Sequence, residues 1–238
     1  GYRVVFPVIG GAMLLPLIFV TRLQESPTRR GTQRFQWQAF RALGRPQFLQ
    51  FALYAVIYSI GSFGIDGLVT YALSEAFGAG EALIGSYGAL RGLGAVIGAV
   101  AGGILLDRLG RRSGALGASA LISIIGLLFG LASKSAVIVW IGLLWGIVWA
   151  FHETVFFALA MDLADTRIAA TMFAIMMGIS NLGAAVGDGT ATAISDNLGF
   201  PVVFGLLAII NMATLPILVR LFHTHPDLKL ATPSSRRV

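Results

Sequence analysis

The sequence has no cysteine and little charge: of its 238 residues, 12% are charged and 56% are hydrophobic. Without cysteine there is neither a disulfide scaffold nor a cysteine-ligated metal site. Ordinary soluble domains carry about 25% charged residues, and a mean hydropathy of +0.82 leaves too little polar surface to cover a water-soluble globule. The composition therefore argues against a soluble enzyme and against a disordered chain, and indicates an integral membrane protein.

Long apolar runs are what the chain has in abundance. A helix needs about 20 mostly apolar residues to cross the hydrocarbon core of a bilayer. Seven runs approach or exceed this length, at residues 4–21, 48–73, 83–106, 114–132, 136–161, 168–194 and 200–221. Continuous runs predict helices rather than barrel strands, which are short and alternate in polarity. The predicted fold class is all-α, a polytopic helical bundle in the lipid bilayer.

The positive charges lie almost entirely on one side of these predicted spans. Fourteen of the 17 lysine and arginine residues fall in segment 22–46, in the loops around 108–112 and 167, or at 220 and beyond; the opposite side has Arg3 and Lys134. Positive residues favour the cytoplasmic side, so we expect the linker 22–46 and the tail 223–238 to be cytoplasmic, in a plasma or bacterial inner membrane. The basic charge then reports topology and predicts no nucleic-acid partner.

Two stretches of the chain resemble each other. Residues 91–110 align without gaps to residues 180–199, an offset of three predicted spans, so the second copy would run inverted in the membrane. Transporter folds often contain such repeats, although chance similarity between Gly/Ala-rich helices remains an alternative. Both copies place glycines four residues apart on one helix face, which predicts close helix packing. These glycines are Gly94, Gly98, Gly102, Gly183 and Gly187.

The loop after the third predicted span reads G-I-L-L-D-R-L-G-R-R, residues 103–112. Gly110 permits a tight turn there. Asp107 can pair with Arg108 or Arg111, or face the positive N-terminus of a neighbouring helix. Basic residues that only fix the topology are the alternative interpretation. The glycines and charged residues of this loop are Gly103, Asp107, Arg108, Gly110, Arg111 and Arg112.

At these positions the chain resembles the major facilitator superfamily of secondary transporters, whose signature loop has the form G-x-x-x-D-R/K-x-G-R/K-R/K. The resemblance implies a twelve-span fold of two six-span halves that binds a small-molecule substrate, with this loop latching one conformation. Residues 1–21 then look like span six, 22–46 like the central linker, and 47–222 like the C-terminal six-helix bundle with its 3+3 inverted repeat. The N-terminal half, absent from the sequence, is the expected partner.

Polar residues within the predicted spans are functional candidates, because a charge inside the membrane is costly unless it is paired or hydrated. Three of them, Asp66, Arg91 and Asp188, lie at a similar depth, so the geometry allows an Asp–Arg pair or a triad. Arg91 then contacts an anionic substrate group or serves as the counter-ion of Asp66, while Glu153 or Asp188 exchanges a proton. The alternatives are a purely structural ion pair for Arg91 and, for Glu153, a position close enough to the cytoplasmic end of its span to reach water. The predicted substrate or ion pathway comprises Asp66, Arg91, His152, Glu153, Asp188 and Asn181.

Other functional classes find little support in the sequence. The stretch from His152 begins like the zinc motif H-E-x-x-H, but Phe156 occupies the second ligand position, so we expect neither a metal nor another cofactor. The phosphate-binding loop G-x-x-x-x-G-K-S/T is absent as well. We therefore predict a secondary active transporter of a small solute that works by alternating access and is coupled to a proton gradient, and we predict no enzymatic activity. A transporter-like sensor or scaffold is the first alternative and an intramembrane enzyme the last.

Overall fold

The computed structural model describes residues 37–225 continuously and, before them, residues 7, 10–11, 14 and 17. The chain divides into two units, Gly1–Gln36 and Trp37–Val238. In the first unit, the five described residues are helical. Most of the predicted span 4–21, the linker up to residue 36 and the tail from residue 226 lie outside the described residues.

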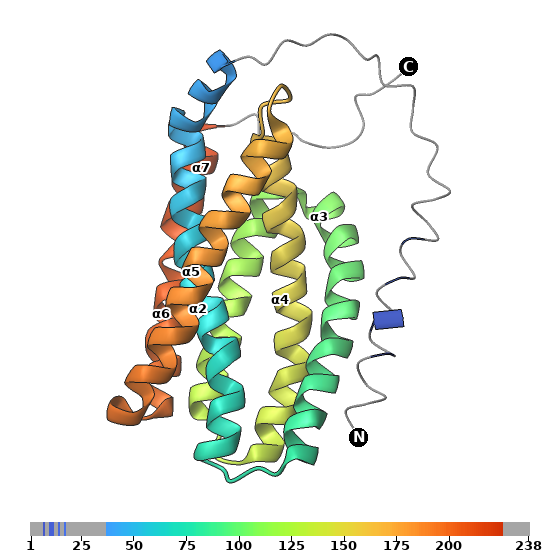
Figure 1. Ribbon diagram of the computed structural model, residues 1–238, viewed down its shortest axis with the longest axis vertical. Coiled ribbons are helices and arrows are strands. Elements are labelled where there is room, and N and C mark those ends of the chain that lie inside the picture. Colours follow the sequence, from blue (N-terminus) through green and yellow to red (C-terminus); the bar gives the residue numbers. More distant parts are fainter. Residues whose placement is uncertain (1–6, 8–9, 12–13, 15–16, 18–36, 226–238) are drawn as a thin grey trace. The chain divides into compact units, whose positions relative to one another are not determined.

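Helices make up nearly all of residues 37–225 (Figure 1). A short 3-10 helix, η1 (Trp37–Gly44), occupies the end of the segment predicted as a linker and precedes α2 (Pro46–Glu75). The remaining elements are α3 (Glu81–Leu131), α4 (Ser135–Leu163), α5 (Ala169–Leu198), α6 (Phe200–Met212) and α7 (Thr214–Thr224). No strand occurs in this part of the chain, which confirms the all-α prediction.

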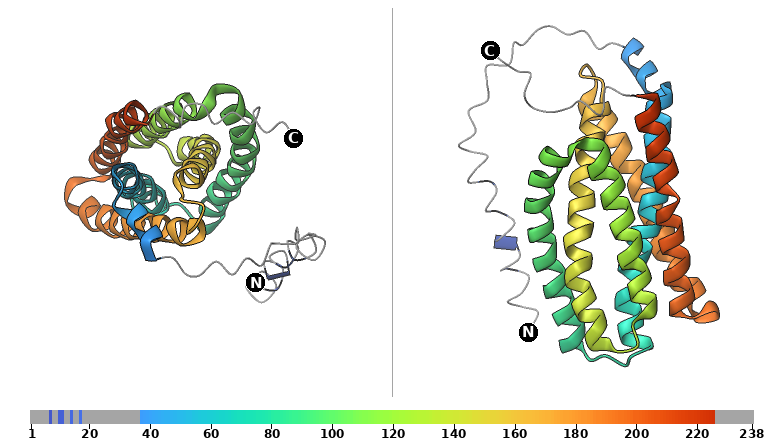
Figure 2. Two further views of the ribbon diagram at one scale, coloured as in Figure 1. Left: turned by 90° about the horizontal axis from the view of Figure 1, so that it is seen from above. Right: turned by 180° about the vertical axis from the view of Figure 1, so that it is seen from behind.

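Five helical segments are long and apolar enough to cross a membrane: α2, α3, α4, α5 and the combined α6–α7. α3 folds back on itself at Gly110, whose φ of 78° lies in the left-handed region that favours glycine. Its two legs, 81–109 and 111–131, run antiparallel (Figure 2). The described helices therefore coincide closely with the six spans expected between residues 48 and 221.

Large apolar side chains stay exposed on the outer faces of these helices. Val96 and Val100 on the first leg of α3 are each 65% exposed, Leu182 on α5 is 70% exposed and Ile209 on α6 is 61% exposed. Soluble monomers rarely expose such extended apolar surface. Contact with lipid accounts for it, and the chain is a polytopic membrane protein.

Glycine lets two pairs of helices approach until their backbones touch. A Cβ atom at Gly94 or Gly98 would overlap the carbonyl oxygens of Leu143 or Ile147, so the first leg of α3 packs directly on α4. On the other side of the bundle, a Cβ at Gly187 would overlap the carbonyl oxygen of Ile60, so α5 packs directly on α2. We call these two contacts the α3–α4 seam and the α5–α2 seam.

The two seams occupy equivalent positions in the repeated stretches. Gly94 and Gly98 align with Gly183 and Gly187, and all four are buried against a neighbouring helix. The first leg of α3 runs toward the end of the bundle that contains Gly110, whereas α5 runs away from it (Figure 1). The repeated sequences therefore form similar contacts in opposite directions, as an inverted repeat requires.

Candidate functional site

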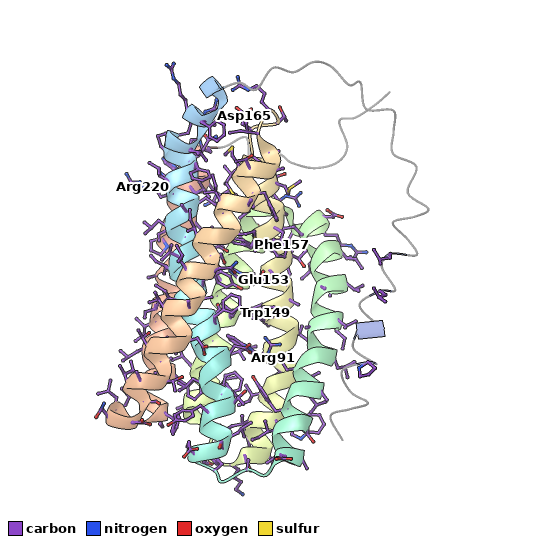
Figure 3. All side chains as sticks on the ribbon, in the orientation of Figure 1. Arg91, Trp149, Glu153, Phe157, Asp165 and Arg220 are labelled. Carbon is purple, nitrogen blue, oxygen red and sulfur yellow. The ribbon has the colours of Figure 1, made fainter. Side chains whose placement is uncertain are left out.

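Polar and aromatic side chains form a series along one face of the bundle. Figure 3 shows Phe157, Glu153 and Trp149 in succession along α4, with Arg91 of α3 next in line. α2 and α5 border the same face. The charges predicted within the spans therefore gather on one side of the bundle, where α2, α3, α4 and α5 meet.

Arg91 and Asp66 form a bidentate ion pair. Arg91 Nε donates to Asp66 Oδ1 at 2.6 Å and an Arg91 terminal nitrogen donates to Asp66 Oδ2 at 2.7 Å. Trp145 Nε1 also donates to Asp66 Oδ1, at 3.0 Å, and the Arg91 guanidinium lies 4.9 Å from the ring centroid of Trp149. The two charged side chains are only 23% and 26% exposed. The Asp66 carboxylate is thus held by three donors from α3 and α4.

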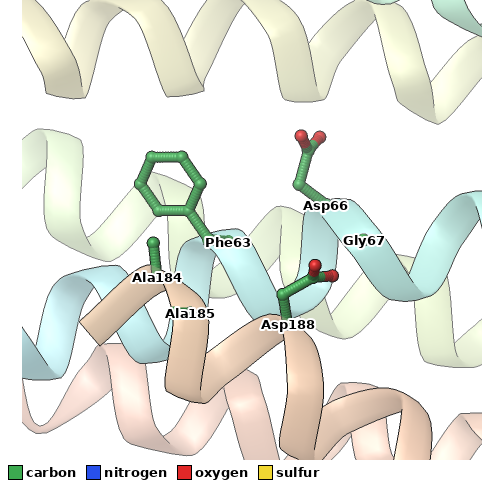
Figure 4. A pocket seen from close by; sticks show the side chains of 6 residues that line it. All are labelled: Phe63, Asp66, Gly67, Ala184, Ala185 and Asp188. Atoms are coloured by element: carbon green, nitrogen blue, oxygen red, sulfur yellow. The ribbon is translucent and has the colours of Figure 1, made fainter. Parts of the chain in front are cut away.

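Asp188 of α5 lies across a pocket from this pair. The pocket has a volume of about 290 Å³ and is lined by residues of α2 and α5 alone: Phe63, Asp66, Gly67, Ala184, Ala185 and Asp188. Figure 4 shows the Asp188 carboxylate beside Gly67 of α2, whereas the Asp66 carboxylate points away from α5. Within the described part of the chain, the Asp188 carboxylate has neither an ion pair nor a hydrogen-bond donor.

Glu153 and His152, adjacent on α4, make separate contacts with tyrosines of α2. Tyr58 donates its hydroxyl proton to Glu153 Oε1 at 2.7 Å, and its ring stacks on His152 with centroids 3.9 Å apart. His152 is fully buried, and its Nε2 lies 2.9 Å from the Tyr54 hydroxyl and 3.2 Å from Ser119 Oγ. His152 therefore belongs to the bundle interior, whereas Glu153 is half-buried at the open face.

Asn181, predicted as part of the pathway, is exposed on α5 and has no hydrogen-bond partner among residues 37–225. Asn211 instead bonds between helices, with its amide 3.2 Å from Ser62 Oγ. Asn181 lies two helical turns from Asp188 on the same helix face. The structure therefore places Asn181 beside the pocket without engaging it.

The signature loop differs in one respect from expectation. Arg111 pairs with Asp162 near the end of α4, Nε to Oδ2 at 2.8 Å, and not with Asp107. Asp107 is exposed, as are Arg108 and Arg112, and has no ion pair in the described part of the chain. Of the two alternatives for Asp107, its pairing with Arg108 or Arg111 is therefore wrong: the backbone reversal at Gly110 brings Arg111 to α4 and leaves Asp107 exposed.

A second ion pair lies in the neighbouring loop between α4 and α5. Arg167 donates to both carboxylate oxygens of Asp165, at 3.0 and 2.8 Å, and Arg45 approaches the same group at 3.6 Å. The Arg167 side chain, its backbone N–H and the charge of Arg45 hold the pKa of the Asp165 carboxyl well below its usual value. This contact links the start of α2 to the α4–α5 loop.

Sequence reasoning missed the neutral partners of these charges. Tyr54, Tyr58, Ser119 and Trp145 complete the polar contacts, yet none was predicted to do so. Tyr54 and Tyr58 lie one helical turn apart, which is a usable signal that α2 presents hydroxyls to one neighbour. Within residues 37–225, no group of three or more His, Asp or Glu side chains could hold a metal ion.

These observations define a polytopic helical membrane protein with a polar face formed by four spans. The sequence model of the Major Facilitator Superfamily matches residues 51–237, and the chain belongs to this superfamily. Its members are transporters, so the chain is a membrane transport protein. A comparison with curated proteins found no match.

Proposed function

We propose that this protein is a secondary active transporter of a small solute that works by alternating access and is driven by a proton gradient. The observation that carries the proposal is the position of Glu153, a half-buried carboxylate within a membrane span, at the open polar face. A carboxylate at this depth is costly to keep charged. Tyr58 stabilises its charged form by donating a hydrogen bond, so Glu153 can be charged or protonated without leaving its site.

A second six-helix half is the proposed partner of this face. The twelve-span architecture of the superfamily supplies such a half, and the side chains on the face remain accessible to it: Phe157 is 39% and Met161 is 61% exposed. We place the end of the bundle with Gly110 in the cytoplasm. The described charges support this, because Arg45, Arg108, Arg112 and Arg167 lie toward that end and Lys134 toward the other.

The test uses the full-length protein in proteoliposomes that enclose a pH-sensitive dye. A panel of amines, organic acids, sugars and peptides is added outside, and proton movement is recorded as each solute is exchanged. We expect at least one solute to move protons, and Glu153→Gln to abolish this coupling while solute exchange without a proton gradient continues. Glu75→Gln, an exposed carboxylate near the end of α2, is the matched control and should behave like the unaltered protein.

Two results would contradict the proposal. If no solute in the panel moves in either direction, secondary transport is refuted, and a sensor or scaffold replaces it. If Glu153→Gln transports solute with unchanged proton coupling, then the proton is carried elsewhere and the role of Glu153 is wrong.

A further inference from the structure

The polar face carries more negative than positive charge at the depth of the pocket. Arg91 is the one cation there within the described residues, and Asp66 neutralises it through two hydrogen bonds. The Arg91 guanidinium also packs against Trp149, and Asp66 is held further by Trp145. An anionic solute would have to displace Asp66 to reach Arg91. The charge that remains available in the pocket is the carboxylate of Asp188.

The Asp188 carboxylate packs against Gly67 of α2. A Cβ atom at Gly67 would overlap Asp188 Oδ1, so the carboxylate lies directly on the Cα atom of this glycine. The α5–α2 seam fixes the spacing, because Gly187, the residue before Asp188, packs on the backbone of Ile60. The carboxylate is thus positioned at the pocket wall by two backbone contacts and without any cationic neighbour.

We propose that the pocket between α2 and α5 binds a small organic ammonium cation, with Asp188 as its counter-ion and the Asp66–Arg91 pair as a fixed wall. This inference rests on the proposed transport function and names its class of solute. A cation in the pocket compensates the unpaired carboxylate of Asp188, which is exposed at the pocket within a membrane span.

The lining of the pocket favours an organic cation over a metal ion. Besides the two carboxylates it presents Phe63, Gly67, Ala184 and Ala185, which are apolar or lack side-chain oxygens. Hard metal cations require six or more oxygen ligands, and no cluster of metal-binding side chains occurs in the described chain. An ammonium group needs only one carboxylate, and its methyl or methylene groups pack on aromatic and small apolar side chains.

Binding of choline to the full-length protein in detergent, measured by isothermal titration calorimetry, tests the site directly. The neutral carbon isostere of choline, in which a tert-butyl group replaces the trimethylammonium group, is the matched ligand. We expect saturable choline binding and at least tenfold weaker binding of the isostere, since about tenfold corresponds to a modest charge interaction. Asp188→Asn should weaken choline binding by about tenfold or more and leave binding of the isostere unchanged.

Two further variants separate the site from general effects on the fold. Asp196→Asn removes a carboxylate from the same helix two turns away, where it accepts a hydrogen bond from Tyr71, and should leave choline binding unchanged. Gly67→Ala places a methyl group in the space that the Asp188 carboxylate occupies. This variant should weaken choline binding although Asp188 itself is retained. Equal melting temperatures for these variants and the unaltered protein show that the bundle is intact.

The inference is overturned by an absence of saturable choline binding, by equal affinity for choline and its isostere, or by choline binding that survives Asp188→Asn. The proposed transport function fails separately. If sugars or organic acids move protons in proteoliposomes while choline does not bind, secondary transport stands and the cation site is wrong. If choline binds through Asp188 but no solute crosses the membrane, the site stands and the transport function is wrong.

Discussion

Replacing Gly98 with alanine is expected to destabilise the bundle, whereas the same change at Gly92 is expected to stabilise it slightly. Both glycines lie in the first leg of α3. A Cβ at Gly98 would lie 2.7 Å from the carbonyl carbon and 2.8 Å from the Cα of Ile147, and would overlap its carbonyl oxygen. A Cβ at Gly92 would meet nothing within 4 Å. Since the atoms at Gly98 are backbone, no rotamer change can make room.

The magnitudes follow from two opposing effects. Overpacking a close contact costs about 1–3 kcal/mol, and replacing glycine by alanine within a helix gains up to about 1 kcal/mol. We therefore expect Gly98→Ala to lower the free energy of unfolding by about 1–2 kcal/mol and Gly92→Ala to raise it by up to about 1 kcal/mol. Trp145, fully buried on α4, reports the transition by its fluorescence during unfolding in mixed SDS micelles. If both variants shift the transition in the same direction by similar amounts, the α3–α4 seam as described is wrong.

Three other changes have definite expected outcomes. In a double-mutant cycle, Arg91→Met and Asp66→Asn should each destabilise the protein by about 2–3 kcal/mol, less than for a fully buried pair because a quarter of each side chain is exposed. The double variant should be destabilised by less than the sum of the two single effects. Additive effects in the same SDS assay would show that the two residues are not coupled. Residues 1–238 contain no cysteine. In full-length protein from which cysteines outside these residues are removed, Arg112→Cys and Lys134→Cys can be labelled individually in intact cells, and a membrane-impermeant maleimide should modify only the second; labelling of the first would invert the topology. The lowered pKa of Asp165 keeps this carboxyl charged down to below its ordinary titration range, so its contribution to the stability of the α4–α5 loop is constant above that range and is lost only as the pH falls through the lowered pKa. Asp165→Asn should therefore accelerate proteolytic cleavage of the loop by the same factor at about pH 5 and about pH 8. A factor that shrinks toward pH 5 would contradict an intact ion pair.

The positions of the helices were predictable because membrane spans obey a strict length and polarity rule. Each described helix from α2 to α7 follows an apolar run in the sequence, and the reversal at Gly110 follows from the one residue type that readily adopts a positive φ. The break between α6 and α7 at Ala213 has a signal in Pro216, three residues later, because a proline inside a helix removes a backbone hydrogen bond and disrupts the preceding turn.

The pairing of side chains between helices was only partly predictable. Asp66 and Arg91 share a depth, and depth is readable from the sequence because a helix rises by a constant length per residue. The partner of Arg111 depends on how far the chain rotates after Gly110, and the contact between Tyr58 and Glu153 depends on which face α2 turns toward α4. Such rotations are set by helix packing, which the order of residues along one helix does not encode.

The two seams have a consequence for how the bundle can deform. A contact of backbone on backbone has no side chains that could exchange rotamers, so each seam joins two helices into one rigid helix pair. The first pair is the first leg of α3 with α4, and the second pair is α5 with α2. The pocket lies in the second helix pair. The first helix pair contains Arg91, Trp145, His152 and Glu153. Along the polar face the two helix pairs are joined by the hydrogen bonds that Asp66 accepts from Arg91 and Trp145 and by the one that Tyr58 donates to Glu153. The contact between Tyr54 and His152 joins them in the bundle interior. We therefore expect a proton or a cation that alters one of these hydrogen bonds to change the angle between the two helix pairs and to leave the α3–α4 seam and the α5–α2 seam intact.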